Sequence, residues 1–184
     1  MNNIIVDIDD AIIDTTYYFD KWLRQQYYYN GSKLYDIDKS YSELNLWDYL
    51  LEFFESDEYI TIPIRPKCID VLTYLSLNNN IIFVSSCGLT EKIRFNRISL
   101  LKNNFDFDFK LELLELNADK ALIIDQYPPL AIFEDNIFNA NYAAHMFGSL
   151  QFIIRTSLYR NKYLSQIDVY NDWSEIKKKK KKKK

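Results

Sequence analysis

The sequence predicts an α/β protein: a parallel β-sheet with helices on both faces, in the three-layer arrangement of Rossmann-like folds. Four short runs rich in β-branched and aromatic residues alternate with longer segments of helical spacing, and this alternation favours a parallel sheet. Residues 14–65 contain no run of the buried-strand kind. This gap indicates a small helical cap inserted after the first strand.

The length and composition suit one folded unit with an appended tail. The chain has 184 residues, of which 48% are hydrophobic, so it can bury a sizeable core. The last eight residues are all lysine, and without them 15 basic residues face 26 acidic ones. We therefore expect an acidic core domain at 1–14 and 66–176, a helical cap at 15–65, and a disordered tail at 177–184.

The four strand-like runs are, in order, Ile4–Val6, Ile81–Val84, Leu130–Phe133 and Leu150–Arg155. Three segments between or beside them have helical spacing: 69–80, 89–104 and 136–148. The first places Ile69, Leu72 and Leu75 on one face, and the asparagines that follow end it. Thr90 is a candidate N-cap of the second helix, and Gly148 is a natural stop for the third.

The expected cap contains two aromatic-rich stretches that look helical, TTYYFDKWLRQQYYY at 15–29 and YSELNLWDYLLEFF at 41–54. Pro63 and Pro66 mark the return to the core. We expect most of the cap aromatics to build the cap's own core. These aromatics are Tyr18, Trp22, Trp47, Tyr49 and Phe54.

The composition also limits the compartment and the partners. Cys68 and Cys87 have no metal-binding spacing, which favours free thiols in a reducing compartment. No apolar stretch approaches the ~18 residues of a membrane-spanning helix, and no signal-peptide pattern opens the chain. We expect a cytoplasmic protein with no membrane partner. Its acidic body disfavours nucleic acid, except for weak contact through 177–184.

Polar side chains follow three of the strand-like runs. The stretch NNIIVDIDDAI runs from a strand into Asp7, Asp9 and Asp10, the second run ends at Ser85–Ser86, and the third ends at Glu134–Asp135. Ligands bind outside the carboxyl ends of the strands in open α/β sheets. A pair of carboxylates ~4 Å apart repels by about 4 kcal/mol at an effective dielectric constant of ~20. A cation or solvent must therefore lie among these aspartates.

The ordered motifs IIVDIDDA, IIFVSS, ADKAL and LAIFEDN resemble those of the haloacid dehalogenase (HAD) superfamily of phosphotransferases, and they span nearly the whole chain. The stretch FFESDEYITIPIRPKCIDVLTYL and the closing YNDWSEIK are similar to the 5'(3')-deoxyribonucleotidase family. The resemblance implies a HAD core and a Mg²⁺-dependent phosphomonoesterase. Its expected substrate is a small phosphorylated molecule, in particular a nucleoside monophosphate.

The resemblance also implies roles for individual residues. Asp7 would attack phosphorus and form an aspartyl-phosphate, and Asp9 would protonate the leaving alcohol and then deprotonate water. Ser85, with Ser86 beside it, would bind a phosphoryl oxygen. Lys120 would supply positive charge, although nearby Lys110 is an alternative.

The same resemblance implies a Mg²⁺ site. The Asp7 carboxylate, the Asp9 backbone carbonyl and the Glu134–Asp135 pair would hold the ion, a sparse oxygen shell of the kind that Mg²⁺ accepts. Spacing does not settle which member of the pair binds the metal, and we favour Asp135. Ala11 departs from the family pattern, which has Thr or Val at this place, and this puts the rigidity of the loop in question.

Three other functions remain open at this stage. One is a polynucleotide 3'-phosphatase. Another is a non-catalytic phosphoacceptor of the receiver type, in which ALIID, ending at Asp125, would be the strand before the phosphorylated aspartate. Receivers lack a cap and place their lysine last, which disfavours them. The third is a HAD scaffold that binds without turnover.

Outside these motifs, we expect His145 to be structural or exposed, and Arg94 and Arg97 to be solvated.

Overall fold

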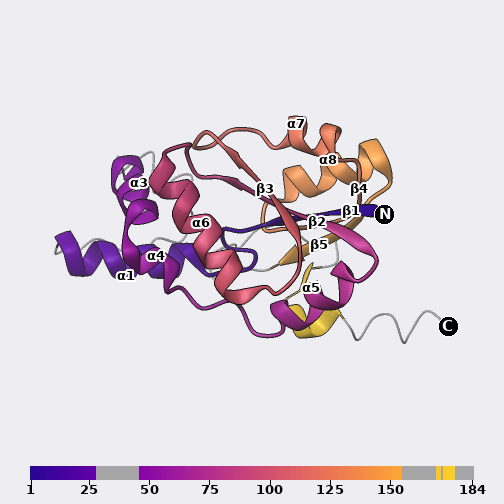
Figure 1. The fold of residues 1–184 in the computed structure, drawn as a ribbon. Coiled ribbons are helices and arrows are strands. Elements are labelled where there is room, and N and C mark those ends of the chain that lie inside the picture. Colours follow the sequence, from indigo (N-terminus) through magenta and orange to yellow (C-terminus); the bar gives the residue numbers. More distant parts are fainter. Residues whose placement is uncertain (28–45, 155–168, 171, 177–184) are drawn as a thin grey trace.

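The computed structural model describes residues 1–27, 46–154, 169–170 and 172–176. These residues form a three-layer α/β fold around a parallel sheet with the strand order β3-β2-β1-β4-β5-β6 (Figure 1). The strands are β1 (Asn2–Asp7), β2 (Asn79–Ser86), β3 (Phe109–Leu114), β4 (Pro129–Glu134), β5 (Leu150–Ile154) and β6 (Val169–Tyr170). The predicted fold class is confirmed.

The helices are α1 (Thr15–Tyr27), α3 (Trp47–Glu55), α4 (Asp57–Ile60), α5 (Cys68–Ser76), α6 (Glu91–Asn104), α7 (Ala121–Gln126) and α8 (Ile137–Phe147), with a 3₁₀ turn η2 (Trp173–Glu175). In the described residues, none of them has both the length and the apolar character needed to cross a bilayer. The Thr90 hydroxyl accepts a hydrogen bond from the Ile93 amide, and Gly148 ends α8 with a left-handed φ of 65°. Both predicted helix ends are confirmed.

The central strand β1 supplies side chains to both layers of the core. Ile4 and Val6 belong to the core cluster that α5, α6 and η2 cover, whereas Ile5 belongs to the cluster under α7 and α8. This alternation follows from the two-residue period of a strand. It fixes the register of β1, because a shift by one residue would exchange the two faces.

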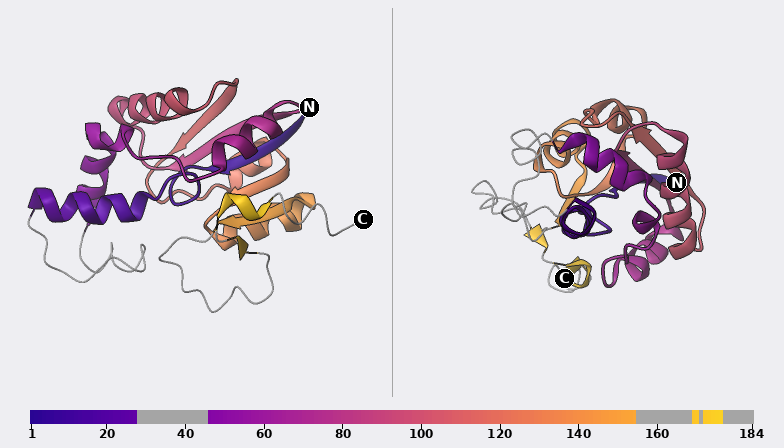
Figure 2. Two further views of the ribbon diagram at one scale, coloured as in Figure 1. Left: turned by 90° about the horizontal axis from the view of Figure 1, so that it is seen from below. Right: turned by 90° about the vertical axis from the view of Figure 1, so that its left-hand side faces the viewer.

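The helices of the insertion, α1, α3 and α4, lie beyond the end of the sheet to which β1 runs (Figures 1 and 2). Aromatic rings join them: Phe53 of α3 lies 5.6 Å from both Phe19 and Trp22 of α1, measured between ring centroids. Of the five aromatics expected to build a core here, Trp22 and Phe54 are buried, and they belong to the same cluster as residues of β1. The other three, Tyr18, Trp47 and Tyr49, are partly buried. The assignment of 15–65 to a separate cap stays a prediction, and residues 28–45 and the lysine tail lie outside the described residues.

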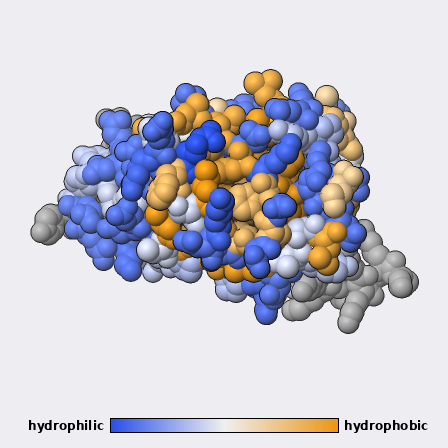
Figure 3. Space-filling view, viewed as in Figure 1, coloured by the Kyte–Doolittle hydropathy of each residue, from blue (hydrophilic) through white to orange (hydrophobic). Residues whose placement is uncertain are grey.

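The structure contains elements that the sequence did not predict, among them the two-residue edge strand β6. The edge strand β3 went unpredicted, because Lys110 and Glu112 interrupt its apolar residues. Hydrophobic residues nevertheless gather over β3 in the middle of the face shown in Figure 3. The stretch ALIID, the strand required by a receiver, forms helix α7 instead, with Ile123 and Ile124 buried.

The buried face of α5 also differs from the predicted one. Cys68, Val71 and Leu72 are buried, whereas Ile69 is 39% exposed. The helix ends at Ser76, close to the predicted stop, and the following asparagines enter β2. Both cysteines are free, as expected, and the structure buries them. His145 is exposed on α8.

Trp173 of η2 anchors the far end of the described chain to the first loop. It is fully buried and stacks on Phe133 of β4, with ring centroids 4.8 Å apart. Its indole Nε1 donates a hydrogen bond of 3.0 Å to the carbonyl oxygen of Ala11. The loop that carries the aspartates is therefore fixed by a residue 162 positions away in sequence.

We expect Trp173→Phe to lower the free energy of unfolding by about 1–3 kcal/mol, because the buried Ala11 carbonyl loses its donor. Urea unfolding followed by circular dichroism measures this. Leu122→Ala, at a side chain 77% exposed, is the control and should change stability by about 0.5 kcal/mol or less. Equal stability of Trp173→Phe and wild type would contradict the prediction.

Candidate active site

The carboxyl ends of β1, β2 and β4 lie next to one another. From β1 the chain first adds β2 and β3 on one side of the sheet, and it then returns to place β4 on the other side of β1. β1 pairs with β2 on one side and with β4 on the other, and the crevice at such a switch point is the usual ligand site of an open α/β sheet. A cleft of about 570 Å³ opens there, and Asp7, Lys120, Asp135 and Trp47 are among its lining residues. The chain thus gathers residues from four distant segments at one edge.

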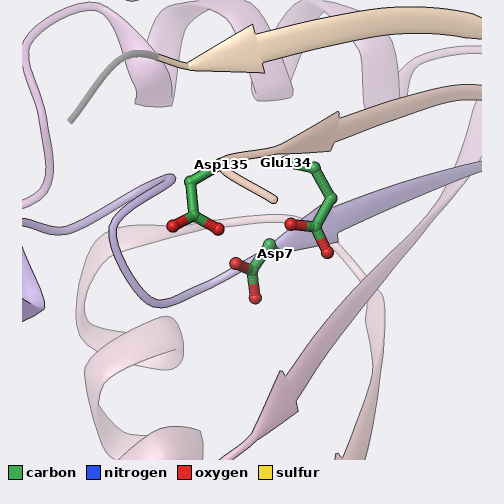
Figure 4. Close-up of side chains that lie close together, drawn as sticks. All are labelled: Asp7, Glu134 and Asp135. Atoms are coloured by element: carbon green, nitrogen blue, oxygen red, sulfur yellow. The ribbon is translucent and has the colours of Figure 1, made fainter. Parts of the chain in front are cut away.

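Three carboxylates converge at this edge (Figure 4). One oxygen each from Asp7, Glu134 and Asp135 lies within 4.8 Å of the others. Lys120, at the start of α7, places its Nζ 2.6 Å from Asp7 Oδ1 and 2.7 Å from Glu134 Oε1. One ammonium group thus bridges two of the three carboxylates. Lys110, the alternative, instead lies over the ring of Tyr127.

Hydrogen bonding separates the two members of the acidic pair. Glu134 is fully buried, and besides Lys120 it accepts hydrogen bonds from the Asn136 amide and the Asn139 side chain. The carboxylate of Asp135 has no hydrogen-bond partner among the described residues and lines the cleft. Asp135 is therefore the member of the pair that can still take a ligand.

The electrostatics of the cluster show a surplus of negative charge. Burial raises the pKa of Asp7 to about 7, against the opposing charge of Lys120. Burial and then the charges of Asp7 and Glu134 raise the pKa of Asp135 well above its usual range. Burial alone would lower the pKa of Lys120, but Asp7 and Glu134 outweigh it and raise that pKa.

An all-oxygen donor set with unsatisfied negative charge fits a hard divalent cation. The carboxylates of Asp7 and Asp135 are the side chains that could hold one, with Glu134 occupied by Lys120. The side chain of Asp9 is engaged elsewhere. The metal-binding role expected of Asp9 concerns its backbone carbonyl and stays a prediction.

Four donors surround the carboxylate of Asp9. Its Oδ1 accepts hydrogen bonds from Thr15 Oγ1 at 2.7 Å and from Tyr59 Oη at 3.5 Å, and it lies 2.8 Å from Arg97 Nη1. Its Oδ2 accepts a hydrogen bond of 2.6 Å from the Ser85 hydroxyl. Asp9 still lines the cleft, so it lies at the boundary between the core and the open site.

The two serines after β2 have different surroundings. Ser85 is fully buried and donates to Asp9, whereas Ser86 lines the cleft and donates to the Ala118 carbonyl. A phosphate-binding role for either one stays a prediction. The thiol of Cys87, next in sequence, is buried, and burial raises its pKa to about 12. At neutral pH this thiol is protonated and is a poor nucleophile.

The loop after β1 is braced despite Ala11. The Asp10 carboxylate accepts hydrogen bonds from the Thr16 amide at 3.0 Å and from the Thr16 hydroxyl at 2.5 Å. Thr15 holds Asp9 in the same way. Hydroxyl groups at the start of α1 thus brace the loop in this chain.

The expectation that Arg97 is solvated is wrong. The side chain is fully buried and pairs with Asp9, and burial lowers the pKa of its guanidinium, which the charge of Asp9 opposes. A signal for this was present: Arg97 lies four residues after Ile93 and four before Leu101, both fully buried, so it shares the buried face of its helix. No comparable pattern in the sequence indicates that Tyr59 donates a hydrogen bond to Asp9 or that Asn139 donates one to Glu134.

No protein-family model and no curated protein sequence matches this chain. Solved structures do match. A candidate beta-phosphoglucomutase from Thermotoga maritima has a TM-score of 0.60 and 15% identity, with 100% of both chains covered. A haloacid dehalogenase-like hydrolase from Streptococcus pneumoniae has a TM-score of 0.62 and 14% identity, covering 97% of this chain and 98% of the other.

A third match is the candidate HAD hydrolase YfnB from Bacillus subtilis, described as bound to magnesium, with a TM-score of 0.53, 11% identity, and 95% of this chain and 96% of the other covered. These identities speak for the fold alone. The chain has the HAD fold. The strand order 3-2-1-4-5-6 also differs from the order 2-1-3-4-5 of receiver domains, so the receiver alternative is wrong.

In this HAD fold, Lys120→Met should lower the free energy of unfolding by about 3–5 kcal/mol, because Asp7 and Glu134 then remain buried without their counter-charge. Urea unfolding in the presence of a chelator measures this without a contribution from metal. The double variant with Glu134→Gln should be less destabilised than the sum of the single variants, by about 0.5–3 kcal/mol. Lys110→Met is the control, with an expected loss of about 1 kcal/mol or less. Additive single effects would show that the two side chains do not interact.

Proposed function

We propose that this protein is a Mg²⁺-dependent phosphomonoesterase that acts through an aspartyl-phosphate on Asp7, with a nucleoside monophosphate as its substrate. The observation that carries the proposal is the convergence of Asp7, Lys120 and Asp135 at the switch point of a HAD fold. No other group of His, Cys, Asp and Glu in the described residues forms such a cluster.

Asp7 has the surroundings of a nucleophile. Its Oδ1 accepts from the Ile8 amide at 2.8 Å and lies beside Lys120, which leaves Oδ2 without a hydrogen-bond partner among the described residues. This second oxygen attacks phosphorus: a bond forms between Asp7 and phosphorus as the bond to the alcohol oxygen breaks. Lys120 offsets the repulsion between the carboxylate and a phosphate dianion.

Asp9 moves the proton in both halves of the reaction. It gives a proton to the leaving alcohol oxygen, and its carboxylate then takes a proton from the water that attacks the aspartyl-phosphate. The second half releases inorganic phosphate and restores Asp7. Asp9 lines the cleft two residues after Asp7, which suits this role.

Mg²⁺, when bound, would offset the charge of the phosphoryl group. Asp7 and Asp135 would hold it. The donor set of oxygens and the unpartnered carboxylate of Asp135 support this choice, and the magnesium in the B. subtilis hydrolase structure is consistent with it.

The substrate class rests on the cleft and on the resemblance to deoxyribonucleotidases. A cleft of about 570 Å³ suits a small molecule. Trp47 of α3, in the insertion, lines the same cleft as Asp7 and Ser86, so the insertion supplies an aromatic ring to the cleft that holds the candidate nucleophile. A ring in that place can stack on a nucleobase.

The purified protein should release phosphate from p-nitrophenyl phosphate in the presence of Mg²⁺ and should lose this activity in a chelator. Asp7→Asn should lower kcat by about 10³-fold or more, because the amide is not a nucleophile. Asp106→Asn, at an exposed aspartate, is the matched control and should retain wild-type activity. Full activity in Asp7→Asn would reject the covalent mechanism.

Among phosphate esters, kcat/KM should be highest for nucleoside 5'- or 3'-monophosphates. A panel with sugar phosphates and 3'-phosphorylated oligonucleotides measures this by phosphate release. Trp47→Ala should raise KM for nucleotides more than for sugar phosphates, by about tenfold, because stacking on a base contributes about 1–3 kcal/mol. Activity confined to oligonucleotides would replace the proposed substrate with a polynucleotide 3'-phosphate.

A further inference from the structure

Arg97 joins three parts of the molecule through one buried side chain. It belongs to α6 on the core, and its Nη1 lies 2.8 Å from Asp9 Oδ1. Its guanidinium carbon lies 4.1 Å from the centre of the Tyr59 ring and 4.5 Å from that of Phe54. Tyr59 belongs to α4 and Phe54 to α3. The guanidinium therefore lies between two rings of the insertion and the candidate proton donor.

Stability alone does not account for an arginine at this place. Its Nε and Nη2 atoms are buried without a hydrogen-bond partner among the described residues, and a buried donor without an acceptor destabilises the fold. A buried ion pair is at best weakly stabilising compared with an apolar pair of the same volume. The two rings compensate in part through cation–π contact. What the arginine provides in addition is a fixed, directional contact to Asp9.

Arg97 also differs from the other donors on Asp9. Thr15, Tyr59 and Ser85 are neutral hydroxyl donors, whereas Arg97 is the cation that the described residues place against this carboxylate. Charge-assisted hydrogen bonds are shorter and stronger than neutral ones, and the planar guanidinium holds its partner in one orientation. The direction in which the Asp9 carboxylate points thus depends more on Arg97 than on any one hydroxyl.

We propose that Arg97 is a positioning residue for Asp9, which holds the carboxylate in place for proton transfer and couples this place to the packing of α3 and α4. The inference rests on the proposed function. Arg97 is not among the residues that line the cleft, so it acts through Asp9 and not on the substrate. A displacement of about 1 Å of such a group can lower a rate by ~10²-fold.

The leaving group of the substrate tests this role. An alkyl alcohol needs a proton to leave, whereas p-nitrophenolate does not. We expect Arg97→Met to lower kcat/KM for glycerol 2-phosphate by about 10²-fold and for p-nitrophenyl phosphate by less than about tenfold. Arg97→Lys, which retains a cation, should recover part of the loss with the alkyl ester.

Asn96→Ala is the matched control. Asn96 is the neighbour of Arg97 on α6, and its Nδ2 donates to the carbonyl oxygens of Phe54 and Ser56. It therefore fastens the same part of the insertion without touching Asp9. This variant should lower the urea midpoint but keep the wild-type ratio of the two kcat/KM values. The inference is overturned if both variants change the ratio equally, or if Arg97→Met leaves it unchanged.

A double-mutant cycle tests the contact without using activity. Arg97→Met and Asp9→Asn should each lower the urea midpoint, and together they should lower it by less than the sum, because both remove the same pair. Additive shifts would overturn the inference. A wild type that hydrolyses neither ester rejects the proposed function, whereas an active wild type with an unchanged ratio in Arg97→Met rejects the inference alone.

Discussion

Surplus negative charge at the carboxyl edge of the sheet is the constraint on which the site depends. Asp7, Glu134 and Asp135 approach one another there, and in the described part of the chain one ammonium group, that of Lys120, lies among them. Burial weakens the screening of like charges, so the cluster stores repulsion. A cation relieves that repulsion, and so does a proton. The pKa of Asp7 is raised to about 7, first by burial and to a smaller extent by the charges of Glu134 and Asp9. The proposed metal site thus follows from the order of the strands, which brings these carboxylates together.

The parts of this arrangement that could be predicted from sequence share one physical origin. A strand buried on both faces must be apolar throughout, and it ends where polar side chains begin. β1, β2 and β4 have this pattern, so their ends, with Asp7, Ser85 and Glu134, could be located before any coordinates. Helix ends that are set by a local residue, such as the Thr90 cap and Gly148, could also be predicted from the sequence.

The rest depends on tertiary contacts that a linear pattern does not contain. β3 lies at the edge of the sheet, where a strand tolerates Lys110 and Glu112. α7 has the apolar composition of a strand, and it becomes a helix beside α8. Arg97 is a charged residue on a buried face, where Asp9 and two rings from the insertion contact its guanidinium. Asn139 likewise donates a hydrogen bond to the same Glu134 oxygen that Lys120 contacts, and no sequence pattern indicates this contact.

The hydrogen bond from Trp173 to Ala11 has a consequence for the order in which the molecule is completed. The aspartate loop is synthesised before its indole donor, which follows 162 residues later in the chain. At a translation rate of ~5–20 residues per second, Trp173 is added roughly 8–30 seconds after Ala11. During this interval the nascent chain carries the acidic loop without the hydrogen bond from Trp173, so this part of the candidate site is completed only after η2 has been made.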